Sequence, residues 1–274
     1  MTCCAADGPE DGRLLETVTV IANERVAEGV GLITLEAPRI TARVEPGQFI
    51  HLRIEQGADF ILRRPFSVHR AGGDSIQVLY QVLGRGTRAL AERRPGERMD
   101  AIGPLGTGFT VPEGTAHVLV VAGGLGVAPM GLLLERLAER GVAVTVVAGA
   151  PTKDRLVAMD AMERDAARVV ACTDDGSFGV AGYVTAAVPE ALSHRPDVVY
   201  VCGPEAMARA VAVLAREAGV PCQVSLERLM ACGIGACLSC VVTLRSGLAR
   251  ACVDGPVFDA EEVSWDASEI PPRH

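Results

Sequence analysis

Residues 232–240 read Cys232-Gly233-Ile234-Gly235-Ala236-Cys237-Leu238-Ser239-Cys240, and a fourth cysteine, Cys252, follows after eleven intervening residues. Three closely spaced cysteines and a distant fourth match the plant-type ligand spacing of a [2Fe–2S] cluster. Gly233 and Gly235 have no Cβ, so the loop can fold tightly and direct backbone N–H groups at the cluster sulfides. The pattern predicts an iron–sulfur site with these four cysteines as ligands.

Two other uses of four cysteines have to be weighed. A structural zinc site usually has two separate Cys-x2-Cys pairs, whereas only Cys237 and Cys240 have that spacing here. Disulfide pairing is typical of secreted proteins, and residues 1–11 contain no apolar stretch of signal-peptide length. We therefore expect a cluster in a cytoplasmic protein, with a Cys4 zinc site as the alternative.

The composition limits the size and the partners of the protein. A chain of 274 residues exceeds a typical single domain and predicts two domains with a small appendage. A net charge of −8 and a pI near 5.2 argue against a surface that binds nucleic acid. Apolar runs free of charge are too short to span a bilayer. We expect neither nucleic acid nor a membrane as a partner.

Short β-like runs, broken by Gly and Pro, fill residues 14–103, with runs at 16–22, 31–36, 49–54, 66–70 and 76–83. This spacing predicts an antiparallel sandwich or closed barrel. Two segments in it suit ligand binding when they occur together, although each alone is more often a turn with a capped helix. Arg63-Arg64-Pro65-Phe66-Ser67-Val68 combines a rigid backbone with a cation for phosphate. Tyr80-Gln81-Val82-Leu83-Gly84-Arg85-Gly86-Thr87 leads from a strand into a helix expected over 87–93, whose N-terminus suits a diphosphate.

This pair of segments resembles the flavin domain of the ferredoxin–NADP reductase superfamily, which holds FAD with an Arg-x-Tyr/Phe-Ser/Thr motif and a later Gly-x-Gly-Thr segment. The resemblance covers nearly the whole chain and implies an FAD-binding antiparallel β-barrel over residues 12–112. It implies that the isoalloxazine and diphosphate are bordered by Arg64, Pro65, Phe66 and Ser67. It further implies that Leu79, Tyr80 and Gln81 run along the flavin and that Gly86 and Thr87 contact the diphosphate.

Residues 113–224 alternate between strand and helix patterns. An apolar run over 117–122 leads into Gly123-Gly124-Leu125-Gly126-Val127-Ala128-Pro129 and a helix through 140. A strand, a Gly-rich turn and a helix form the context of a nucleotide site. Pro129 replaces the third glycine of the Gly-x-Gly-x-x-Gly fingerprint, but the reductase superfamily has Gly-Gly-x-Gly-x-Ala/Thr-Pro at this place. Strands at 143–148, 168–172, 198–202 and 223–226, with helices at 184–193 and 204–218, predict a parallel, doubly wound α/β sheet.

Ligands bind such sheets at the carboxyl ends of the strands, which selects three loops for NAD(H). The first contains Gly123, Gly124 and Gly126. The second contains Asp174 and Asp175, which either meet ribose hydroxyls or cap a turn. The third is Cys202-Gly203-Pro204, which matches a superfamily motif beside the nicotinamide. By that resemblance Cys202 lies near the hydride path, and the alternative is a small buried residue at the end of a strand.

Residues 225–262 are expected to form a cap that carries the cluster, with tails at 1–11 and 263–274. No flexible linker precedes the cap, so we expect it to be held rigidly. Runs at 241–245 and 248–253 predict a hairpin that turns at Ser246-Gly247 and returns Cys252 to the other ligands. We expect a turn over 254–258 and an acidic tail after it.

The ending of the chain is specific. It combines Ser225-Leu226-Glu227, Met230, the cysteine loop and Cys252-Val253-Asp254-Gly255-Pro256-Val257-Phe258. It resembles the electron-transfer subunits of NAD-dependent dihydroorotate dehydrogenases of type B, except that Ser239 stands where glycine is common. The resemblance implies a heterotetramer with an FMN-containing catalytic subunit that oxidises dihydroorotate in pyrimidine (UMP) biosynthesis. This chain has no room for that subunit's barrel, because a (β/α)8 domain needs roughly 250 residues.

The three expected cofactors have complementary chemistry. NAD(H) carries electrons in pairs, a cluster carries them singly, and a flavin does both. We therefore expect an oxidoreductase subunit that passes electrons between NAD(H) and a partner through FAD and [2Fe–2S]. The alternatives are a ferredoxin–NADP reductase or hydrogenase-linked reductase subunit, an oxygenase reductase, and a zinc-stabilised nucleotide-binding sensor.

Overall fold

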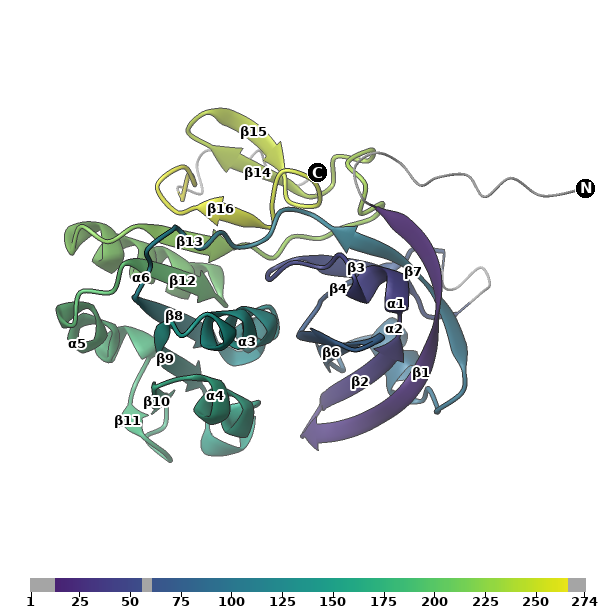
Figure 1. Ribbon diagram of the computed structural model, residues 1–274, viewed down its shortest axis with the longest axis horizontal. Coiled ribbons are helices and arrows are strands. Elements are labelled where there is room, and N and C mark those ends of the chain that lie inside the picture. The colour runs from purple at the N-terminus through teal and green to yellow at the C-terminus, as the bar shows by residue number, and fades with distance from the viewer. Residues whose placement is uncertain (1–12, 56–60, 266–274) are drawn as a thin grey trace, which may run out of the picture.

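The computed structural model describes residues 13–55 and 61–265. Two seven-stranded sheets and one two-stranded hairpin form the fold. In Figure 1 a β-barrel (purple to blue) lies beside an α/β domain (teal to green), and the yellow C-terminal segment lies above them. This arrangement confirms the expected fold class. The expected N-terminal tail over residues 1–11, which contains Cys3 and Cys4, and most of the C-terminal tail fall outside the described residues.

The first sheet is antiparallel throughout, in the order β4-β3-β7-β1-β2-β6-β5. Its elements are β1 (Leu14–Ala27), β2 (Val30–Glu36), α1 (Pro38–Thr41), β3 (Phe49–Arg53), β4 (Arg64–Ser67), β5 (Arg70–Gly72), β6 (Ser75–Gln81), α2 (Arg85–Ala91) and β7 (Arg98–Leu105). The sheet closes between β4 and β5. There the N–H of Val68 donates to the carbonyl of Gln48 at 3.1 Å, and that of His69 to the carbonyl of Gln77 at 2.7 Å. One segment thereby joins both edges, as a closed barrel requires.

Strand β1 shows how the sequence sets the barrel. Its side chains alternate between buried and exposed from Leu14 to Ile21, so one face lies in the core. The strand continues to Ala27, beyond the end expected at residue 22. Two irregularities, after Val20 and after Arg25, shift its register against β2 and bend it around the barrel.

The second sheet has the order β11-β10-β9-β8-β12-β13-β16 and is parallel except for β16. Its first six strands in the chain are β8 (His117–Gly123), β9 (Ala143–Ala150), β10 (Arg168–Thr173), β11 (Val180–Ala181), β12 (Val198–Cys202) and β13 (Cys222–Ser225). Its helices are η2 (Gly124–Val127), α3 (Met130–Glu139), η3 (Lys153–Arg155), α4 (Met159–Asp165), η4 (Val184–Ala186), α5 (Val188–Ser193) and α6 (Glu205–Glu217), where η marks 3-10 turns. The doubly wound sheet predicted from the sequence is confirmed.

Two helices of this domain differ from the sequence prediction. The helix expected over 184–193 is divided into η4 and α5. Pro189 lies in the first turn of α5, where its missing N–H is tolerated, whereas a helix that continued from residue 184 would place it in the interior. Helix α4 was not predicted, because seven residues are too few for a clear helical pattern.

The cap contains a hairpin of β14 (Val241–Leu244) and β15 (Gly247–Arg250), followed by β16 (Val257–Asp259). The predicted turn at Ser246-Gly247 is wrong by one residue, because Leu244 pairs with Gly247 and leaves Arg245-Ser246 as the turn. In this register Val242 and Ala249 lie opposite each other and are both buried, so the register is stabilised by packing on one face of the hairpin. The expected turn and tail after residue 254 are also wrong in part, since β16 pairs with β13 and extends the nucleotide sheet.

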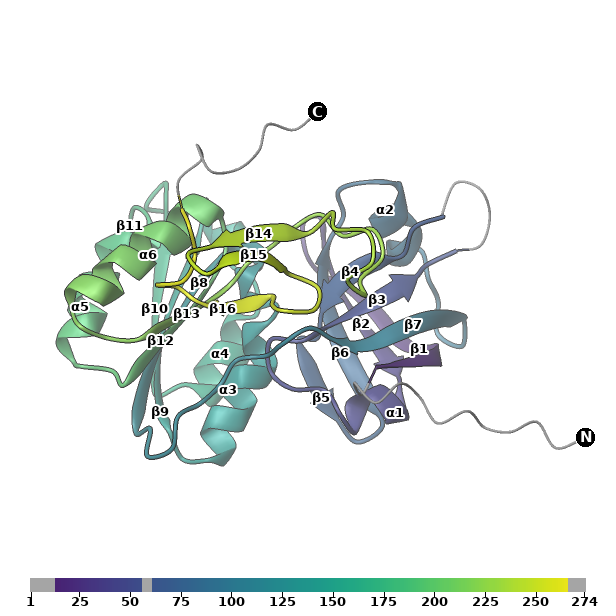
Figure 2. The ribbon, with the colours of Figure 1, turned by 90° about the horizontal axis from the view of Figure 1, so that it is seen from above.

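The three parts share one core. Phe49 and Leu105 of the barrel, Val121 and Val201 of the nucleotide sheet, and Val242 of the cap belong to the same buried cluster. Seen from above, the hairpin β14–β15 crosses the region between the two domains (Figure 2). The cap is therefore packed against both domains, in agreement with the expectation that no flexible linker carries it.

The barrel and the nucleotide domain also meet through polar contacts. The Nδ1 atom of buried His69 lies 2.9 Å from the carbonyl of Ala128, at the start of α3. Arg70 pairs with Asp165 of α4 and lies 3.8 Å from Glu135 of α3. Figure 1 shows α3 between the nucleotide sheet and the barrel. These contacts hold the carboxyl ends of the parallel strands against the barrel.

Candidate electron-transfer site

The four predicted cluster ligands lie together in the cap. Cys232, Cys237 and Cys240 belong to the loop between β13 and β14, and Cys252 follows β15. The hairpin returns Cys252 to that loop, where the N–H of Ala251 donates to the carbonyl of Cys240 at 2.9 Å. The thiol of Cys237 interacts with that of Cys232, and the thiol of Cys252 with those of Cys240 and Cys232. Cys240 and Cys252 are buried, Cys232 is half-buried and Cys237 is exposed.

Backbone N–H groups of the loop point at two of the sulfurs. The Sγ atom of Cys232 accepts from Ile234 at 3.4 Å, Ala236 at 3.3 Å and Cys237 at 3.4 Å, and that of Cys252 accepts from Gly235 at 3.2 Å. Such hydrogen bonds stabilise thiolates, and they tune the reduction potential of a cluster that those thiolates ligate. The loop is thus already arranged to hold negatively charged sulfur.

Two glycines make this loop possible. Gly233 has φ 71° and Gly235 has φ 82°, a region that residues with a side chain adopt rarely. A Cβ atom on Gly233 would lie 2.6 Å from Nδ1 of His51, and one on Gly235 would lie 2.8 Å from Cγ2 of Val253. Both positions therefore exclude a side chain through strain and through contact.

The chemistry of the donor set fits an iron–sulfur cluster. Hydrogen bonds with Ser239, whose Oγ lies 3.2 Å from Sγ of Cys237, lower the pKa of the Cys237 thiol to about 6. Burial instead raises the pKa of the Cys252 thiol, so this ligand needs the charge of bound iron to lose its proton. Within the described ranges, no three Cys, His, Asp or Glu side chains converge as ligands of a single ion. Four thiols gathered in one part of the cap suit a two-iron centre, in which each iron takes two cysteines.

The predicted diphosphate site brings Arg64 of β4 next to the start of α2. A Cβ on Gly86 would lie 3.1 Å from Nε of Arg64, so the guanidinium group crosses directly over this glycine. The Oγ1 atom of Thr87 accepts from the N–H groups of Leu83 at 2.9 Å and Gly84 at 3.2 Å. The helix begins at Arg85, two residues before its expected start. A cation and a helix N-terminus thus share one location, which suits a phosphate group.

The other flavin-motif residues divide between two environments. Pro65, Phe66, Ser67 and Gln81 are half-buried. The rings of Phe66 and Tyr80 meet edge to face, with centroids 6.3 Å apart. Tyr80 lies in the barrel core, 2% exposed, and its hydroxyl donates to Asn23 at 2.8 Å, so its ring supports Phe66 from inside. Leu79 points the other way, into the core shared with the nucleotide domain.

The predicted nucleotide loops lie at a topological switch point. Strands β8 and β12 are neighbours, and the sheet extends from β8 to β9 and β10 on one side and from β12 to β13 on the other. Open α/β sheets bind ligands outside the carboxyl ends of such strands. The loop with Gly123, Gly124 and Gly126 follows β8, and Cys202-Gly203-Pro204 follows β12.

These two loops pack backbone against backbone. A Cβ on Gly126 would collide with the carbonyl of Cys202, and one on Gly203 would lie 3.0 Å from Cα of Gly123. Gly124 has φ 54°. The glycines therefore let the loops approach each other closely, and this leaves backbone rather than side chains at the switch point.

The two remaining predicted residues differ in exposure. Cys202 is 1% exposed, and burial raises its pKa to about 12, so its thiol stays protonated near neutral pH. Asp174 is exposed after β10, on the same edge of the sheet but beyond β9. Its neighbour Asp175 accepts from the N–H of Ser177 at 3.0 Å and caps the turn. Of the two readings for this acidic pair, the turn cap applies to Asp175.

Comparisons with known proteins identify the family. Residues 227–264 match the model of the iron–sulfur cluster binding domain of dihydroorotate dehydrogenase B, and residues 120–213 match the oxidoreductase NAD-binding domain. The chain is 39% identical over 258 residues to the dihydroorotate dehydrogenase B (NAD(+)) electron transfer subunit of Desulforamulus reducens, which covers 90% of this chain and 97% of that protein. The subunit of Bacillus caldolyticus is also 39% identical, over 90% of this chain and 98% of its own. The chain belongs to this family of electron transfer subunits.

Solved structures agree with this family. The NADH-dependent reduced ferredoxin–NADP oxidoreductase, studied for flavin-based electron bifurcation, superposes with a TM-score of 0.81 at 32% identity, over 90% of this chain and 89% of that one. A ferredoxin–NADP+ reductase from Neisseria gonorrhoeae shares the fold, with a TM-score of 0.60 at 19% identity over 75% and 92% of the two chains. Together the matches support FAD, [2Fe–2S] and NAD(H) as the cofactors of this electron transfer subunit, which works with a catalytic subunit. None of the helices in the described part of the chain is long and apolar enough to cross a membrane.

Two residues of the subunit's cluster region were not predicted from the sequence. The Nδ1 atom of His51, on β3, lies 3.2 Å from the carbonyl of Cys232. Burial, followed by the charges of Arg63 and Arg64, lowers the pKa of His51 to about 4 despite that hydrogen bond, so the ring is neutral. Arg13 donates to the carbonyl of Ile234 at 3.3 Å. The only sequence signal for His51 was a histidine inside an apolar strand.

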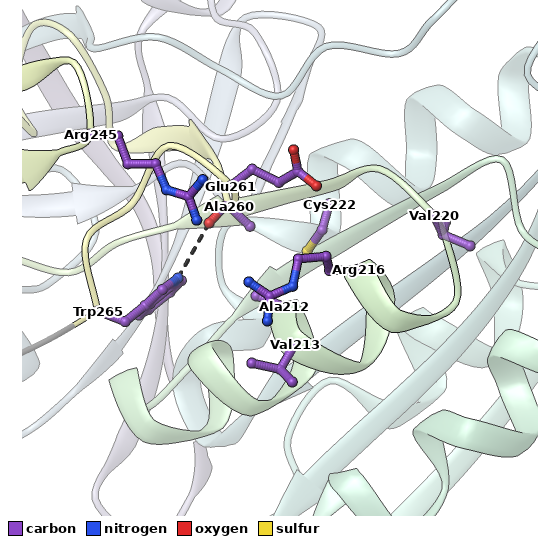
Figure 3. Close-up of a pocket in the computed structure, with 9 residues that line it drawn as sticks. All are labelled: Ala212, Val213, Arg216, Val220, Cys222, Arg245, Ala260, Glu261 and Trp265. Atoms are coloured by element: carbon purple, nitrogen blue, oxygen red, sulfur yellow. Dashed lines mark hydrogen bonds between the residues drawn. The ribbon is translucent and has the colours of Figure 1, made fainter.

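A hollow elsewhere on the subunit contains none of the predicted cofactor residues. It lies beside α6 and is lined by, among others, Arg216, Cys222, Arg245 and Trp265 (Figure 3). The indole N–H of Trp265 donates to the carbonyl of Ala260 at 3.3 Å. This contact joins the end of the described chain to the segment after β16.

Proposed function

We propose that this chain passes electrons between NAD(H) and an FMN-containing dihydroorotate dehydrogenase catalytic subunit, through FAD and a [2Fe–2S] cluster, in pyrimidine biosynthesis. The observation that carries the proposal is the position of the cysteine loop. On its inner side the loop touches β3, the neighbour of the flavin-motif strand β4. On its outer side Cys237 is exposed. A cluster in this place has one side toward the flavin domain and one side toward solvent or a partner.

The roles of the site residues follow from where they lie. We assign the FAD diphosphate to Arg64, Gly86 and Thr87, and the isoalloxazine to the surroundings of Pro65, Phe66, Ser67, Leu79, Tyr80 and Gln81. We assign NAD(H) to Gly123, Gly124, Gly126, Asp174, Gly203 and Pro204, with Cys202 beside the hydride path as a neutral thiol. We assign the cluster to Cys232, Cys237, Cys240 and Cys252. The corresponding domain limits are 12–112, 113–224 and 225–262.

When bound, the flavin accepts electrons in pairs and releases them singly, which is the conversion that links NAD(H) to a cluster. The chain's own residues position these steps. The switch-point loops offer backbone N–H groups to the dinucleotide, and the contacts of His69 and Arg70 hold this edge of the sheet against the barrel. The N–H groups around Cys232 and Cys252 stabilise the ligating thiolates.

We place the partner surface at a groove of mixed polarity in the cap, which includes Leu238, the residue after Cys237. Leu238, which is 62% exposed, and Leu248, which is 74% exposed, line it together with Val241 and Leu244. We call these four residues the cap groove. Exposed leucines next to a redox centre suit a protein interface. We assign the groove to the catalytic subunit, in a heterotetramer.

The location in the cell is proposed from the thiols. All seven cysteines in the described ranges are unpaired, which suits a reducing compartment. We therefore place the protein in the cytoplasm.

Reconstitution tests the function. The chain alone should oxidise NADH with artificial acceptors and form no orotate, and addition of the FMN-containing subunit should create dihydroorotate-dependent NAD+ reduction. Leu238→Glu should weaken the complex at least about tenfold, as a charge does in the centre of an interface. Ile21→Glu is the matched control, because Ile21 is 49% exposed and lies on β1, further along the chain than Arg13, which contacts the cysteine loop. Orotate formation by this chain alone would refute the assignment.

A second function is favoured by one observation. The structure that superposes at 32% identity belongs to an NADH-dependent reduced ferredoxin–NADP oxidoreductase. A reductase subunit of that kind would use the same three cofactors with a different partner. Tight assembly with such a partner, without assembly with a dihydroorotate dehydrogenase subunit, would support this second function over the first.

A further inference from the structure

One buried side chain joins the cysteine loop to the flavin-motif strand. His51 lies in the middle of β3, in the sequence Phe49-Ile50-His51-Leu52-Arg53. It is 0% exposed, like its neighbours Ile50 and Leu52. Across the strand pair it lies opposite Pro65 of β4, so the two side chains share one face of the sheet. The assignment of that strand to the flavin rests on the proposed function.

The contact between His51 and the cysteine loop has a defined direction. A carbonyl oxygen only accepts hydrogen bonds, so Nδ1 of His51 carries the proton and donates to the carbonyl of Cys232 at 3.2 Å. Gly233, the next residue, presents its Cα to the ring. A Cβ there would lie 2.6 Å from Nδ1 and 3.0 Å from Cγ of His51. The ring therefore fits against the backbone of two consecutive loop residues.

Packing alone does not explain a histidine at this position. Among the described residues, Nε2 of His51 has no hydrogen-bond partner although it is buried. A leucine, as at residue 52, would fill the core without an unsatisfied polar atom. Within the described part of the chain, the histidine thus leaves one buried nitrogen without a hydrogen bond. The hydrogen bond that its ring does make is the one to the carbonyl of Cys232.

We propose that His51 is a positioning residue for electron transfer, whose Nδ1–H fixes the backbone of the first cluster cysteine to the strand pair that carries the flavin motif. One side chain then sets the separation and orientation of the flavin and the cluster. The bond also turns the Cys232 carbonyl toward β3, while the N–H groups of the same loop point at the sulfurs. In this role His51 acts through the backbone of Cys232.

The test uses the holoprotein with three substitutions of His51. Asn places its amide N–H near the position of Nδ1 and keeps the donor, whereas Gln places its amide near Nε2 and loses that donor. Leu removes both ring nitrogens. Rapid mixing with NADH separates reduction of the flavin from reduction of the cluster, and the EPR spectrum and midpoint potential report the cluster itself. Iron and FAD contents of the wild type are measured first, and their absence would refute the proposed function rather than this inference.

The expected results distinguish positioning from a general structural role. His51→Leu and His51→Gln should slow reduction of the cluster at least about tenfold, as small displacements of reacting groups do. Both substitutions should also shift the EPR spectrum of the cluster. In these two variants the rate of flavin reduction by NADH should stay within about twofold of the wild-type rate. His51→Asn, which keeps the donor, should reduce the cluster at near the wild-type rate. His69→Leu is the matched control, because His69 is also buried and bonded through Nδ1 to a carbonyl, but that of Ala128. It should leave the EPR spectrum of the cluster unchanged.

Two outcomes would overturn the inference. One is a wild-type rate of cluster reduction with an unchanged EPR spectrum in His51→Leu. The other is a wild-type phenotype of His51→Gln together with a defect in His51→Asn, which would assign the role to Nε2. If His51→Leu does not fold, the comparison of Asn with Gln decides the question alone.

Discussion

The Nε atom of Arg64 lies 3.1 Å from the position that a Cβ atom would occupy on Gly86. The two residues are far apart in the chain, one on β4 and one at the start of α2. Their contact places the guanidinium group over the N-terminus of the helix, where both attract a phosphate. We therefore propose that the two segments of the flavin motif form a single anion site.

This relationship predicts the effect of two substitutions on FAD binding. Arg64→Ala should raise the Kd for FAD by roughly ten- to a hundredfold, because a charge-assisted hydrogen bond is worth about 1.5–3 kcal/mol. Gly86→Ala should also weaken binding, since the new methyl group displaces Arg64. Flavin fluorescence measures both. Gly72→Ala is the control, because a Cβ there meets open space. Unchanged affinity in Arg64→Ala would place the diphosphate elsewhere.

Removal of one ligand should separate the cluster from the flavin. Cys237→Ala should abolish the iron content and the EPR signal while FAD stays bound, because the flavin motif lies in the barrel. NADH should still reduce the flavin, but single-electron delivery to the partner should fail. Cys222→Ala, at a buried cysteine of β13, should keep the cluster. Intact single-electron delivery in Cys237→Ala would show that the cluster assignment is wrong.

The acidic pair after β10 should divide into one ligand-binding and one structural residue. Asp174→Asn should raise the Kd for NADH severalfold, because we assign its exposed carboxylate to the ribose hydroxyls. Asp175→Asn should instead loosen the turn, since Asp175 accepts from the N–H of Ser177. Calorimetric titration with NADH and thermal unfolding distinguish the two effects. Equal NADH affinity in wild type and Asp174→Asn would remove Asp174 from the site.

The contact between the domains should depend on pH through Asp165. Burial raises the pKa of this carboxyl, but hydrogen bonds from Arg164 and Arg70 outweigh it, so the pKa lies below its ordinary value of 3.8. The stabilisation is present above the ordinary value and is lost as the pH falls through the lower value of the folded state. Asp165→Asn should therefore lower the free energy of unfolding by about 1.5–3 kcal/mol at pH 7.

The difference in free energy of unfolding between wild type and Asp165→Asn should shrink as the wild-type carboxylate becomes protonated in acid. Thermal unfolding of both proteins from pH 7 down into the acid range measures it. Asp154→Asn serves as the control, because Asp154 is an exposed carboxylate of the same domain. A difference between wild type and Asp165→Asn that stays constant over this range would contradict the electrostatic explanation.

Most of the architecture could be predicted from local patterns. The apolar run of β8 with its glycine turn, and the short strands of the barrel, are signals that neighbouring residues carry by themselves. The cysteine spacing likewise predicted which residues gather in the cap. Local patterns failed where pairing depends on distant partners. Strand β16 is three residues long and exists because β13 offers it a free edge.

The sequence by itself determined the kinds of sites in this protein: a cysteine loop, a flavin motif and a switch-point glycine turn, each coded in one or two short segments. Only the tertiary structure decided how the segments meet. His51 and Cys232 are 181 residues apart, and Arg64 reaches Gly86 only because the barrel closes between them. Such contacts arise from the packing of the whole core and leave no periodicity in the chain. For that reason the cofactor sites could be expected from the sequence, whereas the residue that connects two of them could not.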